Sequence, residues 1–204
     1  MFLKRSILKR TPSRRLRAWS GLLWCLLAGL MTLPLAEIRA QTPVSKEYQV
    51  KAAFLFNFAQ FVEWPPAAFA DAAAPFCIGI LGDDPFGTAL DQTLQGETIH
   101  NRKLIVERSR RVEDLKDCQI IFISKSEKGR VFEILSQLNA RPALTVSEVE
   151  GFTRRGGGIN FYREGNRVRF EINPGAAQRE GLKISSQLLS LGKIVESEPA
   201  KEER

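Results

Sequence analysis

Short apolar runs that alternate with segments of helical character constrain this chain more than any other feature. Residues 76–81 (FCIGIL) and 119–123 (QIIFI) are almost entirely apolar. Continuous runs of this length are typical of strands that are buried on both faces of a parallel sheet. The pattern predicts four such strands, at residues 76–81, 103–107, 119–123 and 143–146. Strands that alternate with helices indicate a mostly parallel sheet with helices on both faces.

The segments around these strands have the periodicity and the boundaries of helices. A predicted helix at 44–63 is apolar on most of its circumference, so we expect it to be buried, and Trp64-Pro65-Pro66 ends it because proline cannot continue the hydrogen-bond ladder. Asp84 and Ser126 are expected N-caps, and Asn173-Pro174 is expected to open the last helix. The remaining predicted helices are 85–95, 127–139 and 175–194.

The pattern changes near the C-terminus, where apolar and polar residues alternate. Residues 158–162 and 167–172 are predicted strands, joined by the polar turn 163–166. Alternation with a short turn is typical of an antiparallel hairpin at the side of a sheet. The predicted fold class is therefore α/β: a three-layer sandwich whose mostly parallel sheet ends in an antiparallel C-terminal hairpin.

The N-terminus has the pattern of an export signal. Residues 1–17 carry seven basic residues and no acidic one, residues 18–36 carry no charge, and a small-residue exit ends at Ala40. This order is typical of a secretory signal peptide, and we expect cleavage after Ala40 and a periplasmic location. An uncleaved anchor helix is the alternative, because the uncharged run at 18–36 is close to the length of about 20 apolar residues that a membrane span needs. One domain is then expected at 41–195, and the polar segment 196–204 is expected to be a disordered tail.

The charge of the chain is concentrated in that N-terminal segment. The whole sequence has 30 basic and 23 acidic residues, and residues 1–40 hold eight of the basic ones and one acidic one. The exported part therefore has a net charge near zero, which removes the basic footprint that nucleic-acid binding needs. It also predicts that partner binding depends only weakly on salt.

Two cysteines remain after cleavage, Cys77 and Cys118. Cys77 lies near the start of the first predicted strand, and Cys118 immediately precedes the third. Parallel strands start at the same edge of a sheet, so neighbouring strands bring the two residues within the roughly 7 Å between Cα atoms that a disulfide requires. An oxidising compartment permits the bond, and we predict it over two buried thiols.

No constellation of catalytic residues is visible in the sequence. His100 is the only histidine and lies in a polar loop. There is no zinc-ligand spacing, no nucleophile elbow and no glycine-rich nucleotide loop. We therefore expect no enzymatic activity, no cofactor and no metal.

Two sets of residues are candidates for ligand binding. Asp83 and Asp84 follow the first strand, and Ser124 and Ser126 follow the third, at the carboxyl ends where open α/β sheets bind ligands. The alternative is ordinary capping and turn chemistry. Residues 154–158 form the second candidate set.

In this second set, Arg154-Arg155 precedes Gly156-Gly157-Gly158. Backbone N–H groups in such a glycine run can form an anion-binding nest. A tight bend that leads into the hairpin is the simpler interpretation, because glycine tolerates positive φ.

Several stretches together resemble the YfiR family of exported bacterial regulators. The resemblance covers nearly the whole exported chain, in order, and rests on KAAFLFNF (51–58), FVEWP (61–65), IGILGDDPF (78–86), CQIIFIS (118–124), LTV (144–146), GGINF (157–161), RFEIN (169–173) and GLKISSQLL (181–189). It implies a periplasmic protein that represses a membrane-bound diguanylate cyclase, a GGDEF protein or a related sensor, by binding its periplasmic domain. Family members can carry a second cysteine pair near residues 148–155, which this chain lacks.

Two hypotheses of function follow. A repressor that docks on a membrane sensor predicts an exposed apolar patch, for which Phe69, Phe152 and part of the face formed by Phe54, Phe58 and Phe61 are candidates. A receptor for a small ligand instead predicts a pocket with convergent polar groups at the edge that contains Asp83 and Ser124. The sequence leaves open whether the protein forms a homodimer.

Overall fold

The computed structural model describes residues 46–197. The predicted export signal at residues 1–40 and residues 198–204 of the predicted tail lie outside the described residues. Within 46–197, no helix has both the length and the apolar character that a membrane span requires.

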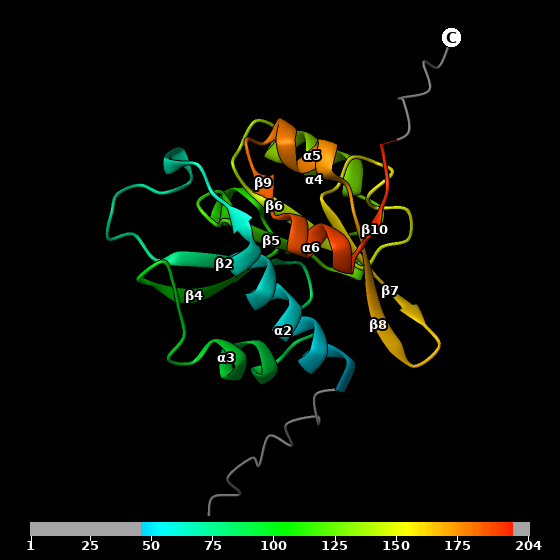
Figure 1. The fold of residues 1–204 in the computed structure, drawn as a ribbon, viewed down its shortest axis with the longest axis horizontal. Coiled ribbons are helices and arrows are strands. Elements are labelled where there is room, and N and C mark those ends of the chain that lie inside the picture. Colours follow the sequence, from blue (N-terminus) through cyan, green and yellow to red (C-terminus); the bar gives the residue numbers. More distant parts are fainter. Residues whose placement is uncertain (1–45, 198–204) are drawn as a thin grey trace, which may run out of the picture. The chain divides into compact units, whose positions relative to one another are not determined.

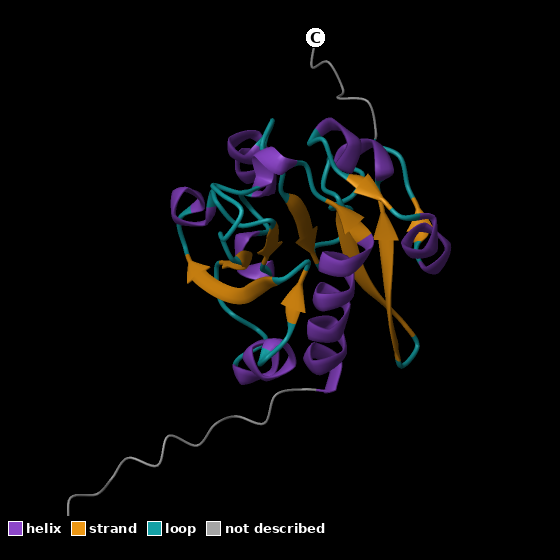
Figure 2. Ribbon diagram, turned by 60° about the vertical axis from the view of Figure 1, so that its left-hand side comes forward, coloured by secondary structure: helices purple, strands orange, loops and turns teal. Residues whose placement is uncertain are grey.

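An eight-stranded sheet organises the described chain (Figures 1 and 2). All its neighbouring pairs are parallel except β7–β8 and β3–β4, so the predicted α/β class with an antiparallel C-terminal hairpin is confirmed. In sheet order the strands are β10 (Lys193–Ile194), β8 (Arg167–Ile172), β7 (Ile159–Glu164), β6 (Leu144–Ser147), β5 (Ile120–Ile123), β2 (Phe76–Leu81), β4 (Arg102–Ser109) and β3 (Thr98–Ile99).

Helices cover both faces of this sheet and bury two separate apolar clusters. The larger cluster contains the buried side of the long helix α2, and the smaller one contains that of α4. Strand β2 contributes to both, because Ile78 and Ile80 face the first cluster and Cys77 and Leu81 the second. The helices are α2 (Lys46–Phe61), α3 (Thr88–Leu94), α4 (Val131–Leu138), α5 (Pro174–Arg179) and α6 (Ser186–Leu191), with 3-10 turns η2 (Pro66–Ala68), η3 (Val112–Leu115) and η4 (Lys125–Glu127).

Helix α2 packs against one face of the sheet (Figure 2), and its buried side chains belong to the larger cluster. The Phe58 ring is fully buried, with its centroid 5.7 Å from that of Phe161 and 5.2 Å from that of Phe170 on the hairpin strands. The helix predicted at 44–63 is confirmed in its main part. Its last two residues, Val62 and Glu63, instead form strand β1, which pairs antiparallel with β9 (Lys183–Ile184).

The predicted cap of the second helix is wrong. Helix α3 begins at Thr88 after Gly87, and Asp84 lies too early to cap it. Asp84 Oδ1 instead accepts a hydrogen bond from the N–H of Phe86 at 2.7 Å, and Oδ2 pairs with Arg108 Nε at 2.7 Å. The carboxylate therefore closes the turn that follows β2 and ties it to β4.

The predicted cap of the third helix is also wrong. Ser124, not Ser126, is the capping residue, and it caps the 3-10 turn η4. Helix α4 starts later than predicted, at Val131, while its inward residues Val131, Ile134 and Leu138 are buried as its periodicity indicates.

The final helix predicted at 175–194 is wrong, because two short helices and two short strands occupy this segment. Asn173 does open α5, since its side chain accepts from the N–H of Ala176 at 2.9 Å. Gly181, with φ of 74°, then ends α5, a conformation that disfavours any residue with a Cβ. The hydroxyl of Ser185 accepts from the N–H of Leu188 and starts α6.

A disulfide joins Cys77 and Cys118, as predicted, with their Cα atoms 4.4 Å apart. Strands β2 and β5 are neighbours in the sheet, so the start of β2 and Cys118, two residues before β5, meet at one edge. A cross-link that closes a loop of this length contributes about 2–4 kcal/mol to stability.

Candidate functional site

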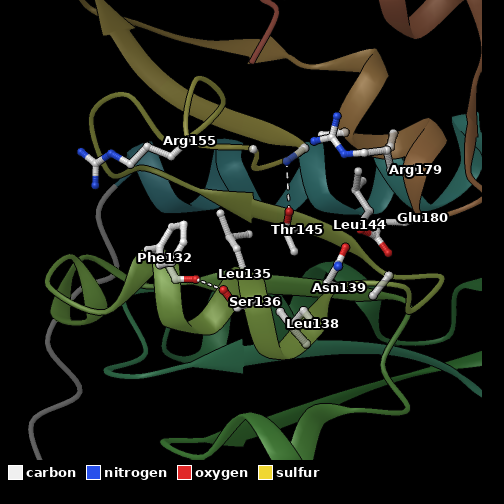
Figure 3. Close-up of a pocket in the computed structure, with 15 residues that line it drawn as sticks. Phe132, Leu135, Ser136, Leu138, Asn139, Leu144, Thr145, Arg155, Arg179 and Glu180 are labelled. Atoms are coloured by element: carbon white, nitrogen blue, oxygen red, sulfur yellow. Dashed lines mark hydrogen bonds between the residues drawn. The ribbon is translucent and has the colours of Figure 1, made fainter. Parts of the chain in front are cut away.

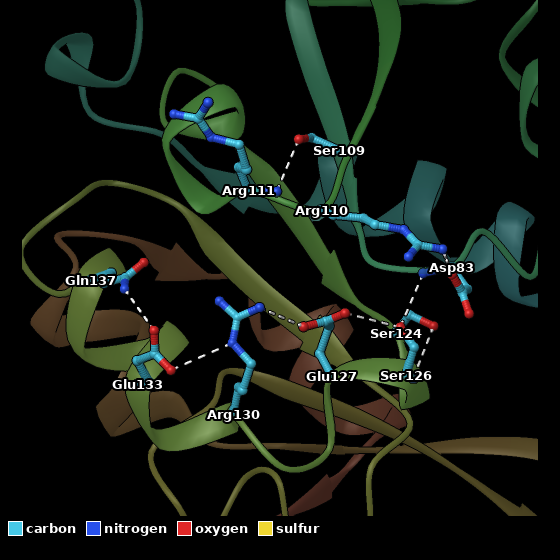
Figure 4. Close-up of polar contacts among 10 residues, drawn as sticks. All are labelled: Asp83, Ser109, Arg110, Arg111, Ser124, Ser126, Glu127, Arg130, Glu133 and Gln137. Carbon is cyan, nitrogen blue, oxygen red and sulfur yellow. Dashed lines mark hydrogen bonds and ion pairs between the residues drawn. The ribbon is translucent and has the colours of Figure 1, made fainter.

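At the edge where the sequence offered a possible ligand cleft, the polar side chains contact other parts of the chain (Figure 4). The Ser126 hydroxyl accepts from the N–H of Asp83 at 3.0 Å, and the Asp83 carboxylate pairs with Arg110 at 2.6 Å. A Cβ at Gly82 would lie 2.3 Å from Ser126 Oγ, which shows how closely the turn after β2 approaches η4. Asp83, Asp84 and Ser124 therefore take part in turn, cap and ion-pair contacts, which is the interpretation that the sequence left as the alternative.

The glycine run at 156–158 forms a bend. The N–H groups of Gly156 and Gly157 donate to the carbonyls of Thr153 and Phe152, and that of Gly158 donates to the Thr145 hydroxyl at 3.0 Å. Donors that already have partners inside the chain do not form an anion nest. The exposed Arg155 donates to the carbonyl of Glu150 at 2.8 Å.

Phe152 is wrong as a docking residue, because its side chain is fully buried. Its ring packs over Gly157, where an added Cβ would lie 2.1 Å from it. Of the other predicted aromatic residues, Phe58 is buried, and Phe54, Phe61 and Phe69 are partly buried against the larger cluster. Phe54 lines a surface groove.

That groove, here called the α2–hairpin groove, lies between the N-terminal half of α2 and the β7–β8 hairpin and has a volume of about 570 Å³. Its apolar floor is formed by Val50, Phe54 and Val168, and the Val50 side chain is 45% exposed. Its polar lining is formed by Lys46, Glu47, Arg163, Asn166, Arg167 and Arg169. Apolar surface inside a predominantly cationic rim fits an acidic partner with apolar anchors.

A second hollow of about 480 Å³ adjoins the groove and shares Glu47 and Arg163 with it. Arg163 Nη1 lies 3.6 Å from Glu47 Oε2, so this ion pair stands where the two hollows meet. Glu150, Arg154 and Lys193 also line the second hollow. Of the second candidate set, Arg154 thus lies beside the groove.

A buried polar cluster fixes this part of α2 to the sheet. The Lys51 side chain is 3% exposed, and its ammonium donates to Glu47 Oε1 at 2.6 Å and to Glu148 Oε2. The Tyr48 hydroxyl donates to Glu148 Oε1 at 2.9 Å. Glu148 directly follows β6, so the cluster joins the helix to the carboxyl end of a central strand.

The same cluster sets the electrostatics of the groove. The hydrogen bond from Lys51 lowers the pKa of Glu47 below its ordinary value of 4.5, and this outweighs the opposing effect of burial. Burial and the neighbouring Glu148 carboxylate raise the pKa of Tyr48. Glu47 therefore stays ionised at neutral pH and neutralises part of the cationic rim.

Sequence reasoning missed Lys51 and Glu148 as a pair. One signal was present, because Lys51 lies on the same face of the helix as Tyr48 and Leu55 in an otherwise apolar stretch. A charged side chain on such a face must be paired if it is buried. The identity of its partner, 97 residues away, depends on the sheet order.

A third groove lies between α4 and α5, with a volume of about 210 Å³ (Figure 3). Phe132 on its rim is 79% exposed. Glu180 Oε2 is buried without a hydrogen-bond partner among the described residues, and burial raises the pKa of this carboxyl although backbone N–H groups of Arg141 and Ala140 oppose the shift.

The fold and these grooves define an α/β domain with several open grooves on its described surface. The chain belongs to the YfiR/HmsC-like family, whose model matches residues 48–193. The resemblance drawn from the sequence is thereby confirmed. A comparison with curated proteins gave no match.

One solved structure with a similar fold is a conserved domain protein from Vibrio cholerae O1 biovar El Tor strain N16961. It has a TM-score of 0.50 and 10% sequence identity, and the match covers 72% of this chain and 59% of that one. At this identity the likeness shows the fold alone.

Proposed function

We propose that this protein is an exported regulator that binds the periplasmic domain of an inner-membrane sensor, a GGDEF diguanylate cyclase or a related protein, and represses it. Membership of the YfiR/HmsC-like family supports a regulatory role in cyclic di-GMP signalling. Docking, without catalysis, is the mechanism: the protein binds the inactive state of the sensor better than the active one. A difference of about 2–3 kcal/mol shifts that balance roughly 30- to 150-fold.

The α2–hairpin groove is the observation that carries this proposal. Val50 and Phe54 offer an apolar surface in a concave site, and Arg163, Arg167 and Arg169 surround it with positive charge. We therefore propose that the sensor presents an acidic segment with one or two apolar anchors, which become desolvated in the groove and supply most of the binding energy. The flanking arginines select the partner and increase the association rate.

The groove is well suited to such a role because its walls are held in place. Lys51 and Glu148 fix one wall, α2, to the carboxyl end of β6. The other wall is the hairpin, whose strands pair along their whole described length from Ile159↔Ile172 to Glu164↔Arg167. A preformed groove loses little conformational entropy on binding.

The rim also changes the expected salt dependence. A net charge near zero predicts little electrostatic steering, but the groove is lined by four basic side chains and one acidic one, Glu47, so its local charge is positive even though Arg163 and Arg169 are paired with carboxylates. Short-range steering depends on the local field, so we expect binding to weaken as ionic strength increases.

The test is a pair of groove variants in cells that express the sensor. Val50→Asp places a charge on the apolar floor, and Arg167→Glu reverses one charge of the rim. Both side chains are exposed, so the fold should tolerate either change. We expect cyclic di-GMP to rise toward the level of a gene deletion, and the affinity for the purified periplasmic domain of the sensor to fall at least about tenfold.

Lys116→Glu is the matched control, because Lys116 is exposed and follows η3, away from the groove residues. It should repress like the wild type. Full repression by both groove variants would exclude this groove as the docking surface. A deletion that leaves cyclic di-GMP unchanged while the sensor is expressed would reject the repressor function itself.

A further inference from the structure

Three possible metal ligands converge at the edge where the disulfide lies. Cys77 Sγ, Cys118 Sγ and a carboxylate oxygen of Glu107 all lie within 4.8 Å of one another. Cys118 Sγ is 3.8 Å from Glu107 Oε2. The two cysteines are buried and Glu107 is exposed, so the cluster opens to solvent on the side of the carboxylate. Glu107 did not figure among the site residues predicted from the sequence.

The register of the sheet brings these residues together. Strand β4 runs parallel to β2, with Ile105 opposite Cys77 and Glu107 opposite Gly79. Residues two apart on a strand face the same side, so Cys77, Gly79 and Glu107 share one face. Cys118 Sγ would lie only 3.2 Å from a Cβ at position 79, so glycine leaves the space in which sulfur and carboxylate meet.

Contacts other than the disulfide hold the two cysteines close to each other. The N–H of Cys77 donates to Gln119 Oε1 at 2.7 Å, and the N–H of Gln119 donates to the carbonyl of Cys77 at 3.0 Å. The same glutamine side chain donates to the carbonyl of Asp117 at 3.0 Å. These bonds do not depend on the sulfur–sulfur bond, so we expect both thiols to stay at this edge after reduction.

We propose that reduction of the disulfide converts this cluster into a site for a thiophilic divalent cation such as Zn²⁺, with Cys77, Cys118 and Glu107 as ligands. A dithiol reductant supplies two electrons and two protons: the sulfur–sulfur bond breaks, two thiols form, and the reductant becomes a disulfide. Binding of the cation then releases both thiol protons. Thiolates and carboxylates are both zinc ligands, and with three protein ligands a water occupies the fourth tetrahedral position.

The consequence is that a metal replaces the disulfide as the link between β2 and β5. Zinc is redox-inert and binds deprotonated thiols, so it keeps the pair from reoxidation while restoring the cross-link. The exported protein would then remain tied at this edge under both oxidising and reducing conditions. This inference does not rest on the proposed docking function.

The experiment uses the full chain with Cys25→Ser, so that Cys77 and Cys118 are its only thiols. The protein is reduced with a dithiol, freed of reductant under anaerobic conditions, and titrated with Co²⁺ and then Zn²⁺. We expect one Co²⁺ per chain with thiolate-to-cobalt charge-transfer absorption that Zn²⁺ abolishes. The oxidised protein should show no such absorption.

Glu107→Gln separates the proposed site from two thiols that bind metal on their own. Loss of a ligand should weaken Zn²⁺ binding about 100-fold, at least as much as loss of an outer-shell partner. Glu113→Gln is the control, because this carboxylate is also exposed but lies on η3, and it should bind like the parent. Both variants are checked for an unchanged unfolding midpoint in the oxidised form.

Either of two results would overturn the proposal. One is a reduced protein that shows no charge-transfer absorption at stoichiometric Co²⁺. The other is a Glu107→Gln variant with the same Zn²⁺ affinity as the Glu113→Gln control.

Discussion

Replacing Lys51 with methionine tests whether the buried cluster holds α2 in place. Lys51 and Glu148 have side chains that are only 3% and 4% exposed. Lys51→Met would leave Glu148 with the Tyr48 hydroxyl at 2.9 Å and with the mostly exposed Lys125 ammonium at 3.8 Å. Removing one partner of a buried ion pair costs about 3–5 kcal/mol, because the remaining charge stays in a poorly solvating site. We expect a loss near the lower limit, about 3 kcal/mol, since two contacts survive.

The double variant Lys51→Met/Glu148→Met makes the test specific. It removes both charges together, so the desolvation cost disappears with them, and replacing a buried pair by apolar residues is often close to neutral. We expect it to be about 2 kcal/mol more stable than Lys51→Met alone, a strong coupling between the two sites. Urea unfolding followed by circular dichroism measures each free energy.

Lys46→Met is the matched control, since Lys46 lies on the same helix but is exposed. Its free energy of unfolding should stay within about 0.5 kcal/mol of the wild type. If Lys51→Met costs less than about 1 kcal/mol, or if the double variant loses the sum of the two single losses, the cluster does not act as a coupled pair and the reasoning is refuted.

Three further predictions concern other features. Glu47 has a lowered pKa in the folded state, so its contribution to stability is present above about pH 4.5 and is lost as the pH falls through the folded pKa; Glu47→Gln should therefore lower the unfolding free energy at pH 7 more than at pH 3. Gly157→Ala should destabilise by about 3 kcal/mol in thermal unfolding, because its Cβ would lie 2.1 Å from the buried Phe152 ring; a cost below 1 kcal/mol would show that the ring moves freely. Mass spectrometry of the periplasmic fraction should find a chain that begins at Gln41, and a membrane-bound species that retains the apolar segment would contradict export with cleavage.

Local patterns determined most of the fold. The run FCIGIL at 76–81 is strand β2 with every residue buried, as a continuous apolar run indicates. The alternating residues at 167–172 form a hairpin strand, and the pair Cys77–Cys118 is bridged. Each of these predictions depends on the chemistry of a few neighbouring residues, or on the rule that parallel strands begin at one edge.

Helix boundaries were less predictable, because several caps compete within a few residues. Asp84 and Ser126 both have the right chemistry for an N-cap. In the structure, however, Asp84 accepts a hydrogen bond from the N–H of Phe86 in the turn after β2, and Ser126 accepts one from the N–H of Asp83 in the same turn. The predicted helix at 175–194 failed for a related reason. Gly181 and Ser185 are helix-ending and helix-starting signals, but the strand between them forms only because Val62–Glu63 lies beside it as a pairing partner.

In the candidate site, too, some features follow from the local sequence and others only from the tertiary structure. The sequence by itself determined the α/β class, the family resemblance and the apolar character of the Phe54 face, and the export signal stays a prediction. Only the tertiary structure decided that Phe152 is core, that Lys51 meets Glu148, and that arginines of the hairpin surround Phe54. It also placed Glu107 beside the two cysteines. Propensities and caps are properties of neighbours in the chain, whereas a charge pair or a groove exists only once the order of the strands has brought distant residues together.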